Sequence, residues 1–454
     1  MPVMIAILCA MAIAYRYYSA FIAARVAVLD DSRTTPAVRL NDGQNYHPTN
    51  KWVLFGHHFA AISGAGPLIG PVLAAQFGYL PGLLWIVIGV CLGGAVQDFL
   101  VLVASMRRNG QSLAQIAFEE IGRIGGTTAM TAILFIIVIA LAGLGKVVVN
   151  ALGGEAVKYP ADSQLVVTDP IQSSAPGRYL IPANSKLVWN GGKSEMTIKE
   201  PFVLKSPVAP LATPSADRST STLPIPPGAV RAMPGSSWGT FTIAATIPIA
   251  LFVGLYMYKL RPGRVAEASI IGAALTIGAT IAGAWVARHP IGAWFNLTQV
   301  QVTWAMAIYG FVAAVLPVWV LLAPRDYLSS FLKIGTIALL VIGTIVANPK
   351  LEAPAFNEVF KNGGPIVGGK IFPFLFITIM CGAISGFHAL VSSGTTPKMI
   401  KNEKDARTIG YGAMLIEGLV GCVAMIAAAT LPVGDYYAMN TALANAPAFH
   451  DKIV

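Results

Sequence analysis

Long, continuously apolar runs recur along this chain, and they constrain its fold more than any other feature. About ten of them approach the roughly 20 residues that a helix needs to cross a membrane. Of the 454 residues, 55% are hydrophobic and only 11% are charged, whereas a soluble protein has about 25% charged residues. The runs lack the alternating polarity of barrel strands. The sequence therefore predicts an all-α polytopic membrane protein.

The apolar runs are joined by polar loops, which locate each span to within a few residues. We predict spans near residues 2–22, 52–76, 82–104, 128–149, 238–258, 265–287, 301–323, 331–347, 371–392 and 408–430. The first run has no basic segment before it and no convincing cleavage site. We therefore interpret it as an uncleaved span and not as a signal peptide.

Residues 150–237 differ from the rest of the chain because they are polar and rich in Pro and Ser. Within them, KLVWN and MTIKEPFVLK have the composition of short strands bounded by turns. We expect a small, partly β insert over 150–237, with a flexible stretch over 206–228. An N-terminal bundle over 1–149 and a second bundle over 238–454 would flank it.

Lys and Arg gather in alternate short loops, which predicts how the spans are oriented. MRRNG follows the third span, KLRPGR the fifth, PRD the seventh and PKMIKNEKDAR the ninth. Basic loops face the cytoplasm, so we expect the insert and the N-terminus outside. The same distribution accounts for the net charge of +10 without a nucleic-acid partner.

The second predicted span contains FGHHFAAISGAGPLIGP, residues 55–71, which combines two histidines with residues that disfavour a helix. In a helix interior Gly costs about 1 kcal/mol and Pro about 3 kcal/mol, while Pro67 suits the first turn of a new helix. We predict two half-helices with unwound backbone near 62–66. Unwound backbone in a membrane must be buried in protein or line a cavity.

The ninth predicted span contains a similar interruption, in FPFLFITIMCGAISGFHALVSSGTTPK, residues 372–398. The tetrapeptide AISG occurs at 61–64 and again at 383–386. By the predicted orientation the first copy runs outward and the second runs inward. Two discontinuous helices of opposite direction are typical of inverted-repeat transporters whose sites lie near the middle of the membrane.

Five ionisable residues inside apolar runs are candidates for function, because such residues are rare there and usually functional. His57, His58 and His388 could each bind a substrate carboxylate or carry a proton, since imidazole titrates near neutral pH. Adjacent residues on a helix point about 100° apart, so His57 and His58 cannot both face one site fully. Asp98 and Glu417 are candidates for proton coupling. The alternative for all five is a structural hydrogen bond or ion pair between helices.

These features define a candidate substrate site beside a candidate coupling site. The predicted substrate-binding residues are His57, His58, Ser63, Gly64, Gly66, Ser385, Gly386 and His388. A third group, Ser392, Ser393, Thr395 and Thr396, could bind a sodium ion or a substrate carboxylate, or could satisfy the broken backbone. The sequence lacks zinc-ligand spacings, a phosphate-binding loop and a dinucleotide fingerprint, so we expect neither a metal nor a cofactor.

Most of the chain outside the insert resembles the CstA carbon-starvation family of bacterial membrane transporters, most specifically over residues 35–115. The resemblance is carried by NDGQNYHPTNKWVLFGHHFAAISGAGPLIGPVLAAQFGYLPGLLWIVIG, by GAVQDFLVLVASMRRNGQSL and by GFHALVSSGTTPK. It implies a multi-pass transporter of the bacterial inner membrane that takes up peptides, or pyruvate with protons, when preferred carbon is scarce. It also implies a leucine-transporter-like inverted repeat. Family members usually continue with further C-terminal spans, so we expect a fragment, a split protein or a shorter variant.

We therefore predict a secondary transporter for small carboxylate-bearing carbon sources, embedded in the lipid bilayer. The rival functions are an ion channel or gated pore, and a membrane sensor that presents the insert. An intramembrane enzyme is disfavoured, because the sequence has neither an HExxH nor a paired-aspartate protease pattern. The residues leave open peptide against pyruvate and proton against sodium.

Overall fold

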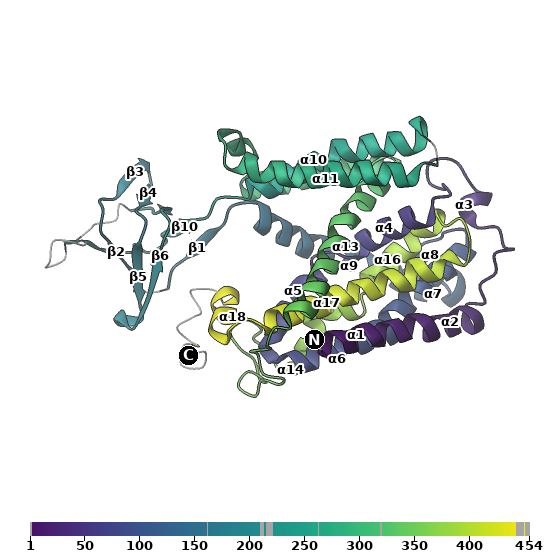
Figure 1. Cartoon of the computed structure of the whole chain (residues 1–454), viewed down its shortest axis with the longest axis horizontal. Coiled ribbons are helices and arrows are strands. Elements are labelled where there is room, and N and C mark those ends of the chain that lie inside the picture. The colour runs from purple at the N-terminus through teal and green to yellow at the C-terminus, as the bar shows by residue number, and fades with distance from the viewer. Residues whose placement is uncertain are drawn as a thin grey trace.

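A computed structural model of the chain describes residues 2–160, 162–208, 213–214, 221–261, 263–317, 320–441 and 449. Most of these residues are helical, and a β-structured insert extends from one end of the helical bundle (Figure 1). The start of α1 and the insert lie toward the same end, whereas the linker that carries α3 lies at the opposite end. This arrangement is consistent with the predicted orientation of the first span.

The first interrupted span consists of α4 (Lys51–Ile62) and α5 (Gly66–Ala74), which are bent by 44° relative to each other. The side chain of Asn50 accepts a hydrogen bond from the backbone N–H of Trp52 and so caps α4. Ser63 leaves the helical conformation, with φ −80° and ψ 77°. Pro67 lies in the first turn of α5, where its missing N–H leaves no helical hydrogen bond unmade.

The second interrupted span consists of three pieces, α14 (Ile371–Thr378), α15 (Met380–Ala383) and α16 (Gly386–Gly394). Ile384 and Ser385 are extended and separate α15 from α16. Both copies of AISG therefore lie at a helix break. The two spans also pack against each other, because α4 contacts α16 and α5 contacts α15. The first half of one span thus lies beside the last half of the other.

Three further helical segments surround these spans and form most of the buried core. They are α1 (Pro2–Ile13) with its continuation to Val26, α6 (Tyr79–Gly89) with η4 (Val90–Gly94) and α7 (Ala95–Arg107), and η9 (Arg407–Gly412) with α17 (Ala413–Ala429). The last of these is the most buried of the membrane-spanning candidates, with 78% of its apolar window inside the protein. It packs against α4, α5 and α6.

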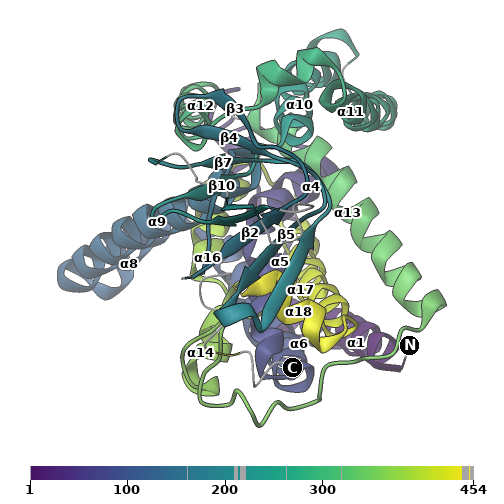
Figure 2. The ribbon, with the colours of Figure 1, turned by 90° about the vertical axis from the view of Figure 1, so that its left-hand side faces the viewer.

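The remaining long helices lie at the periphery and expose apolar side chains. They are α8 (Leu113–Ile121), α9 (Arg123–Leu152), α10 (Ser237–Leu255), α11 (Val265–Ala287), α12 (Gln299–Val315) and α13 (Leu322–Ala347). Figure 2 shows α8 and α9 on one flank of the molecule and α13 on the other. The apolar window of α9 has no buried residue among those that the structure describes, which suits a lipid-facing helix.

One predicted boundary was wrong. The sequence placed a basic loop at PRD, between spans at 301–323 and 331–347. In the structure, Arg325 and Asp326 lie inside α13, which begins at Leu322. Pro324 is the third residue of that helix, where the backbone N–H groups have no intrahelical acceptor in any case. The proline therefore starts a helix here and does not end one.

Within the described residues, seven helices are long and apolar enough to cross a membrane, or eight if the bent pair α4–α5 is one span. The two other predicted spans fall short. Helix α12 has only 17 residues, and the pieces of the second interrupted span have at most 9. The structure thus supports a polytopic helical membrane protein, and the predicted number of about ten spans stays a prediction.

The insert contains two five-stranded antiparallel sheets, with strand orders β1-β10-β7-β4-β3 and β6-β5-β2-β9-β8. The strands are β1 (Ala156–Lys158), β2 (Gln164–Val167), β3 (Gln172–Ala175), β4 (Arg178–Ile181), β5 (Ser185–Trp189), β6 (Ser194–Ile198), β7 (Phe202–Lys205), β8 (Thr213–Pro214), β9 (Ser221–Pro224) and β10 (Val230–Ala232). Of the segments predicted as strands, KLVWN coincides with β5 except for its last residue, and MTIKEPFVLK contains the end of β6 and the whole of β7. Much of the predicted flexible stretch, residues 209–212 and 215–220, lies outside the described residues.

A linker over residues 27–50 crosses the end of the bundle opposite the insert and carries α3 (Pro36–Arg39). The backbone N–H of Thr49 donates to the carbonyl of Met399 at 3.0 Å, which ties the linker to the segment after α16. Within the linker, backbone N–H groups of Tyr46, Gln44 and Asn45 donate to Asp42 and lower the pKa of its carboxyl. The linker is therefore a defined connection at the predicted cytoplasmic face.

Candidate functional site

His388 lies on the first turn of α16 and contacts two carboxylates. Its Nδ1 atom is 3.2 Å from Oδ2 of Asp98 on α7, and its Nε2 atom is 3.2 Å from Oε2 of Glu417 on α17. All three side chains are fully buried. The thiol of Cys381, the second residue of α15, lies 3.7 Å from the other oxygen of Glu417. We call these four residues the His388 cluster.

The His388 cluster can change its charge by binding or releasing protons. With both carboxylates ionised and the imidazole neutral, it would carry two buried negative charges, which is costly without a compensating cation. One proton on His388 gives an ion pair to each carboxylate, and one more neutralises the group. The helix break places this imidazole where α7, α16 and α17 meet. Side chains from all three helices therefore take part in binding the protons.

Among the described residues, the same cluster contains the one group of His, Cys, Asp or Glu side chains that is close enough to hold a metal ion. The ligand atoms of Cys381, His388 and Glu417 all lie within 4.8 Å of one another. Both ring nitrogens of His388 face a carboxylate oxygen, from Asp98 on one side and from Glu417 on the other, which suits a shared proton. We therefore interpret the cluster as a proton-binding group, and the prediction of no resident metal stays a prediction.

The two adjacent histidines of α4 have different partners. Nδ1 of His57 is 3.0 Å from Oδ2 of Asp326 on α13. Nδ1 of His58 is 2.9 Å from Oγ1 of Thr396, at the start of η8 (Thr396–Lys398). Both rings are buried, so each one connects α4 to another segment and they do not share one site.

Lys333 occupies the first helix break, and the sequence analysis did not single it out. Its ammonium group donates to the carbonyl oxygens of Ala60 at 3.0 Å and Ser63 at 2.6 Å. These carbonyls are free because α4 ends there, and the negative end of a helix dipole favours a cation. Its isolated charge within an apolar run was the available signal. Asp326 was missed because it was assigned to a loop.

Helix α7 contacts the second break. The side-chain amide of Gln97 donates to the carbonyl oxygen of Ser385 at 2.6 Å. Asp98, the next residue, reaches His388 one turn further along α16. Gly386 begins α16 directly after the extended residues. Of the predicted substrate-binding residues, Ser63 and Gly64 thus lie at one break, and Ser385 and Gly386 at the other.

The Ser and Thr residues that were predicted as one binding group do not share a partner. Ser393 donates to the carbonyl of Ala389 at 2.7 Å and accepts from the backbone N–H of Leu113 at 3.2 Å. Thr396 is bound to His58. The hydroxyl of Ser392 is buried without a hydrogen-bond partner among the described residues. At Ser393 these contacts favour the structural alternative, in which the hydroxyl satisfies backbone groups.

Glycine at two positions of α5 lets the interrupted spans touch. A Cβ atom on Gly66 would lie 2.7 Å from Sγ of Cys381. A Cβ atom on Gly70 would lie 2.2 Å from the carbonyl oxygen of Thr378. Larger residues would push α5 away from α14 and α15. Gly66 therefore also determines how closely the first break approaches the His388 cluster.

Comparison with known proteins agrees with the resemblance noted in the sequence. The family model described as carbon starvation protein CstA matches residues 1–452. The chain is 45% identical over 430 residues to the pyruvate/proton symporter BtsT of Escherichia coli strain K12, covering 94% of this chain and 49% of that protein.

Two further relatives are named peptide transporter CstA. The one from Escherichia coli strain K12 is 46% identical, with 97% of this chain and 52% of that protein covered. The one from Bacillus subtilis strain 168 is 42% identical, with 97% and 60% covered. The chain thus spans about half the length of the relatives that it matches. No solved structure matches it.

Proposed function

We propose that this chain, which belongs to the carbon starvation protein CstA family, transports small carboxylates across the bacterial inner membrane together with protons. The relatives named above are a pyruvate/proton symporter and peptide transporters. The observation that carries the proposal is the His388 cluster, in which a buried imidazole lies between two buried carboxylates. A membrane protein retains such a costly group where it serves ion or substrate movement.

Proton coupling follows from the charge of the cluster. While the cluster is sealed from water, protonation lowers its buried negative charge and is favoured. When a conformational change hydrates one carboxylate, the proton can leave on that side. Asp98 and Glu417 belong to different helices, α7 and α17, so a relative movement of these helices would alter the contacts of His388.

The arrangement of the interrupted spans supports a transporter with alternating access. Helix α4 packs against α16 and α5 against α15, so the two spans run in opposite directions side by side. This is the relationship expected of a leucine-transporter-like inverted repeat. We propose that substrate binds between the breaks, close to Ser63, Gly64, Ser385 and Gly386.

Protons are preferred to sodium as the coupling ion. A sodium site needs several oxygen ligands that converge on one point, whereas the hydroxyls of Ser393 and Thr396 are engaged with different partners. The His388 cluster instead offers titratable groups. His57 is less suited to proton transfer with His388, since the carboxylate beside its Nδ1 atom belongs to Asp326 on α13.

The test is uptake of labelled pyruvate and a labelled dipeptide by proteoliposomes that contain the full chain. An inward proton gradient and an inward sodium gradient are imposed separately. We expect accumulation above equilibrium with the proton gradient and only equilibration with the sodium gradient. Passive, non-saturable entry under both gradients would identify a pore and overturn the proposal.

A further inference from the structure

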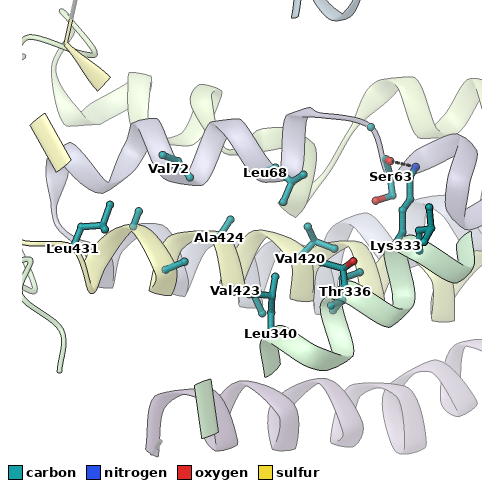
Figure 3. A pocket seen from close by; sticks show the side chains of 15 residues that line it. Ser63, Leu68, Val72, Lys333, Thr336, Leu340, Val420, Val423, Ala424 and Leu431 are labelled. Atoms are coloured by element: carbon teal, nitrogen blue, oxygen red, sulfur yellow. Dashed lines mark hydrogen bonds between the residues drawn. The ribbon is translucent and has the colours of Figure 1, made fainter. Parts of the chain in front are cut away.

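A cavity of about 640 Å³ lies beside the first helix break, between α5, α13 and α17. Figure 3 shows Lys333, Thr336 and Ser63 together at one end of it, and aliphatic side chains from there to Leu431. Its volume falls within the range of small-molecule sites, about 300–1,000 Å³. The His388 cluster is close by, because Val420 lines the cavity one helical turn after Glu417.

Lys333 is held in place at the polar end. Its Nζ atom uses two hydrogens to bind the carbonyl oxygens of Ala60 and Ser63 at the end of α4. An ammonium group has three hydrogens to donate. The third therefore stays available for a ligand, and the positive charge favours an anion at this end. The hydroxyl of Thr336 lies one turn further along α13 and lines the same cavity.

The rest of the lining is aliphatic. Its members include Leu68, Val72, Leu340, Val420, Ala424 and Leu431. Pyruvate has only a methyl group beyond its keto acid and would leave most of this surface without contacts. A longer hydrocarbon tail would bury it, at about 0.8 kcal/mol for each CH₂ group.

The charges of the lining also favour a monocarboxylate over a peptide. Among the described residues that line the cavity, Lys333 is the one charged side chain, and none is acidic. A peptide would bring an ammonium group that no side chain of this lining can pair with, and an unpaired charge in an apolar site is costly. A monocarboxylate brings only the charge that Lys333 complements.

We propose that this cavity is a binding site for monocarboxylates with a branched or linear aliphatic tail, whose carboxylate is bound by Lys333 and Thr336. The inference deepens the proposed function by naming a substrate class, and it rests on that function for the step from binding to transport. The prediction that these acids bind depends only on the cavity and not on the proposed function.

The experiment is equilibrium binding of labelled 4-methyl-2-oxopentanoate to the purified full chain in detergent, with unlabelled competitors. We expect this acid to compete at least tenfold better than pyruvate, because two or more additional buried carbons are worth a factor of ten or more. Leucyl-leucine should compete poorly. The alcohol 4-methylpentanol, which has a similar tail without a charge, should also compete poorly.

Three variants locate the site. Lys333→Met keeps the length of the side chain but removes the charge, and should weaken binding about tenfold or more, as expected for a lost charge-assisted hydrogen bond. Ala424→Leu fills the apolar part and should weaken binding of the branched acid more than that of pyruvate. Lys350→Met removes an exposed lysine outside the cavity and should leave both affinities unchanged. Size-exclusion profiles verify that each variant is folded.

Equal competition by the alcohol and the acid would show an apolar groove for lipid tails and overturn the inference, as would unchanged binding in Lys333→Met. If Lys333→Met does not fold, the loss of selectivity for the branched acid in Ala424→Leu decides the question. Failure of the proposed function is distinguishable. In that case the acid binds and depends on Lys333, but no proton gradient drives its uptake.

Discussion

The first turn of α16 gives one histidine two acidic partners that are far apart in the sequence. Asp98 precedes His388 by 290 positions, and Glu417 follows it on another helix. Neither contact depends on a surface side chain, since all three groups are buried. The proton-coupling role proposed for these residues can therefore be tested by replacing a single ionisable group.

Glu417→Gln preserves the size of the side chain but removes its ability to ionise. We expect proton-driven uptake to fall at least tenfold, while exchange of labelled for unlabelled substrate across the proteoliposome membrane persists, because exchange needs no net proton movement. Glu267→Gln on α11 is the matched control, since Glu267 contacts Tyr256 and lies outside the cluster. Equal loss of uptake and exchange in Glu417→Gln would indicate a structural role.

The sequence identified Asp98, His388 and Glu417 as ionisable residues in apolar runs, but it could not show that they are in contact. Lys333 and Asp326 were missed for different reasons. Lys333 was overlooked within a predicted span, and Asp326 was assigned to a loop because PRD was placed as a basic loop between two predicted spans. A proline in the first turn of a helix looks the same in a sequence as one that ends it.

Among the secondary-structure elements, the two interrupted spans were the most predictable. Gly64, Gly66 and Pro67 indicated the first break, and the structure places α4 and α5 on either side of it. The repeated AISG indicated the second. The contact of α5 with α14 and α15 was not predictable, because it depends on how closely two backbones approach at Gly70.

Gly70→Ala tests that contact. The added methyl group would meet a backbone carbonyl 2.2 Å away, which cannot rotate aside as a side chain can. We expect a loss of about 1–3 kcal/mol in the free energy of unfolding, typical of an overpacked core. Gly343→Ala on α13 is the control, because no atom lies within 4 Å of its Cβ position. Equal thermal stability of the two variants would contradict the close packing.

For the whole molecule, the linker over residues 27–50 joins the first span to the end of the second interrupted span. Glu403 is central to this connection, as its buried carboxylate pairs with Arg107 at 2.6 Å and Arg33 at 3.3 Å. The basic loops predicted the orientation of the spans, but charge counting alone could not show that one acidic residue pairs with two arginines.

Glu403→Ala leaves both arginines without this partner. Because the Arg107 side chain keeps 35% of its surface exposed, water compensates in part, and we expect a loss of about 1–3 kcal/mol in stability. Glu120→Ala removes the exposed partner of the neighbouring Arg108 and should cost less than about 1 kcal/mol. Thermal unfolding in lipid nanodiscs measures both, and a larger effect for Glu120→Ala would refute the role of the linker.

The central claim is that binding and release of protons by the His388 cluster are coupled to substrate transport. It is tested most directly by a pH-sensitive dye enclosed in proteoliposomes, with pyruvate, a dipeptide or a branched 2-oxo acid added outside. The wild-type chain is expected to acidify the lumen when a transported substrate is added, and His388→Gln is expected to abolish this signal. Saturable uptake without any acidification, or acidification that survives in His388→Gln, would contradict the claim.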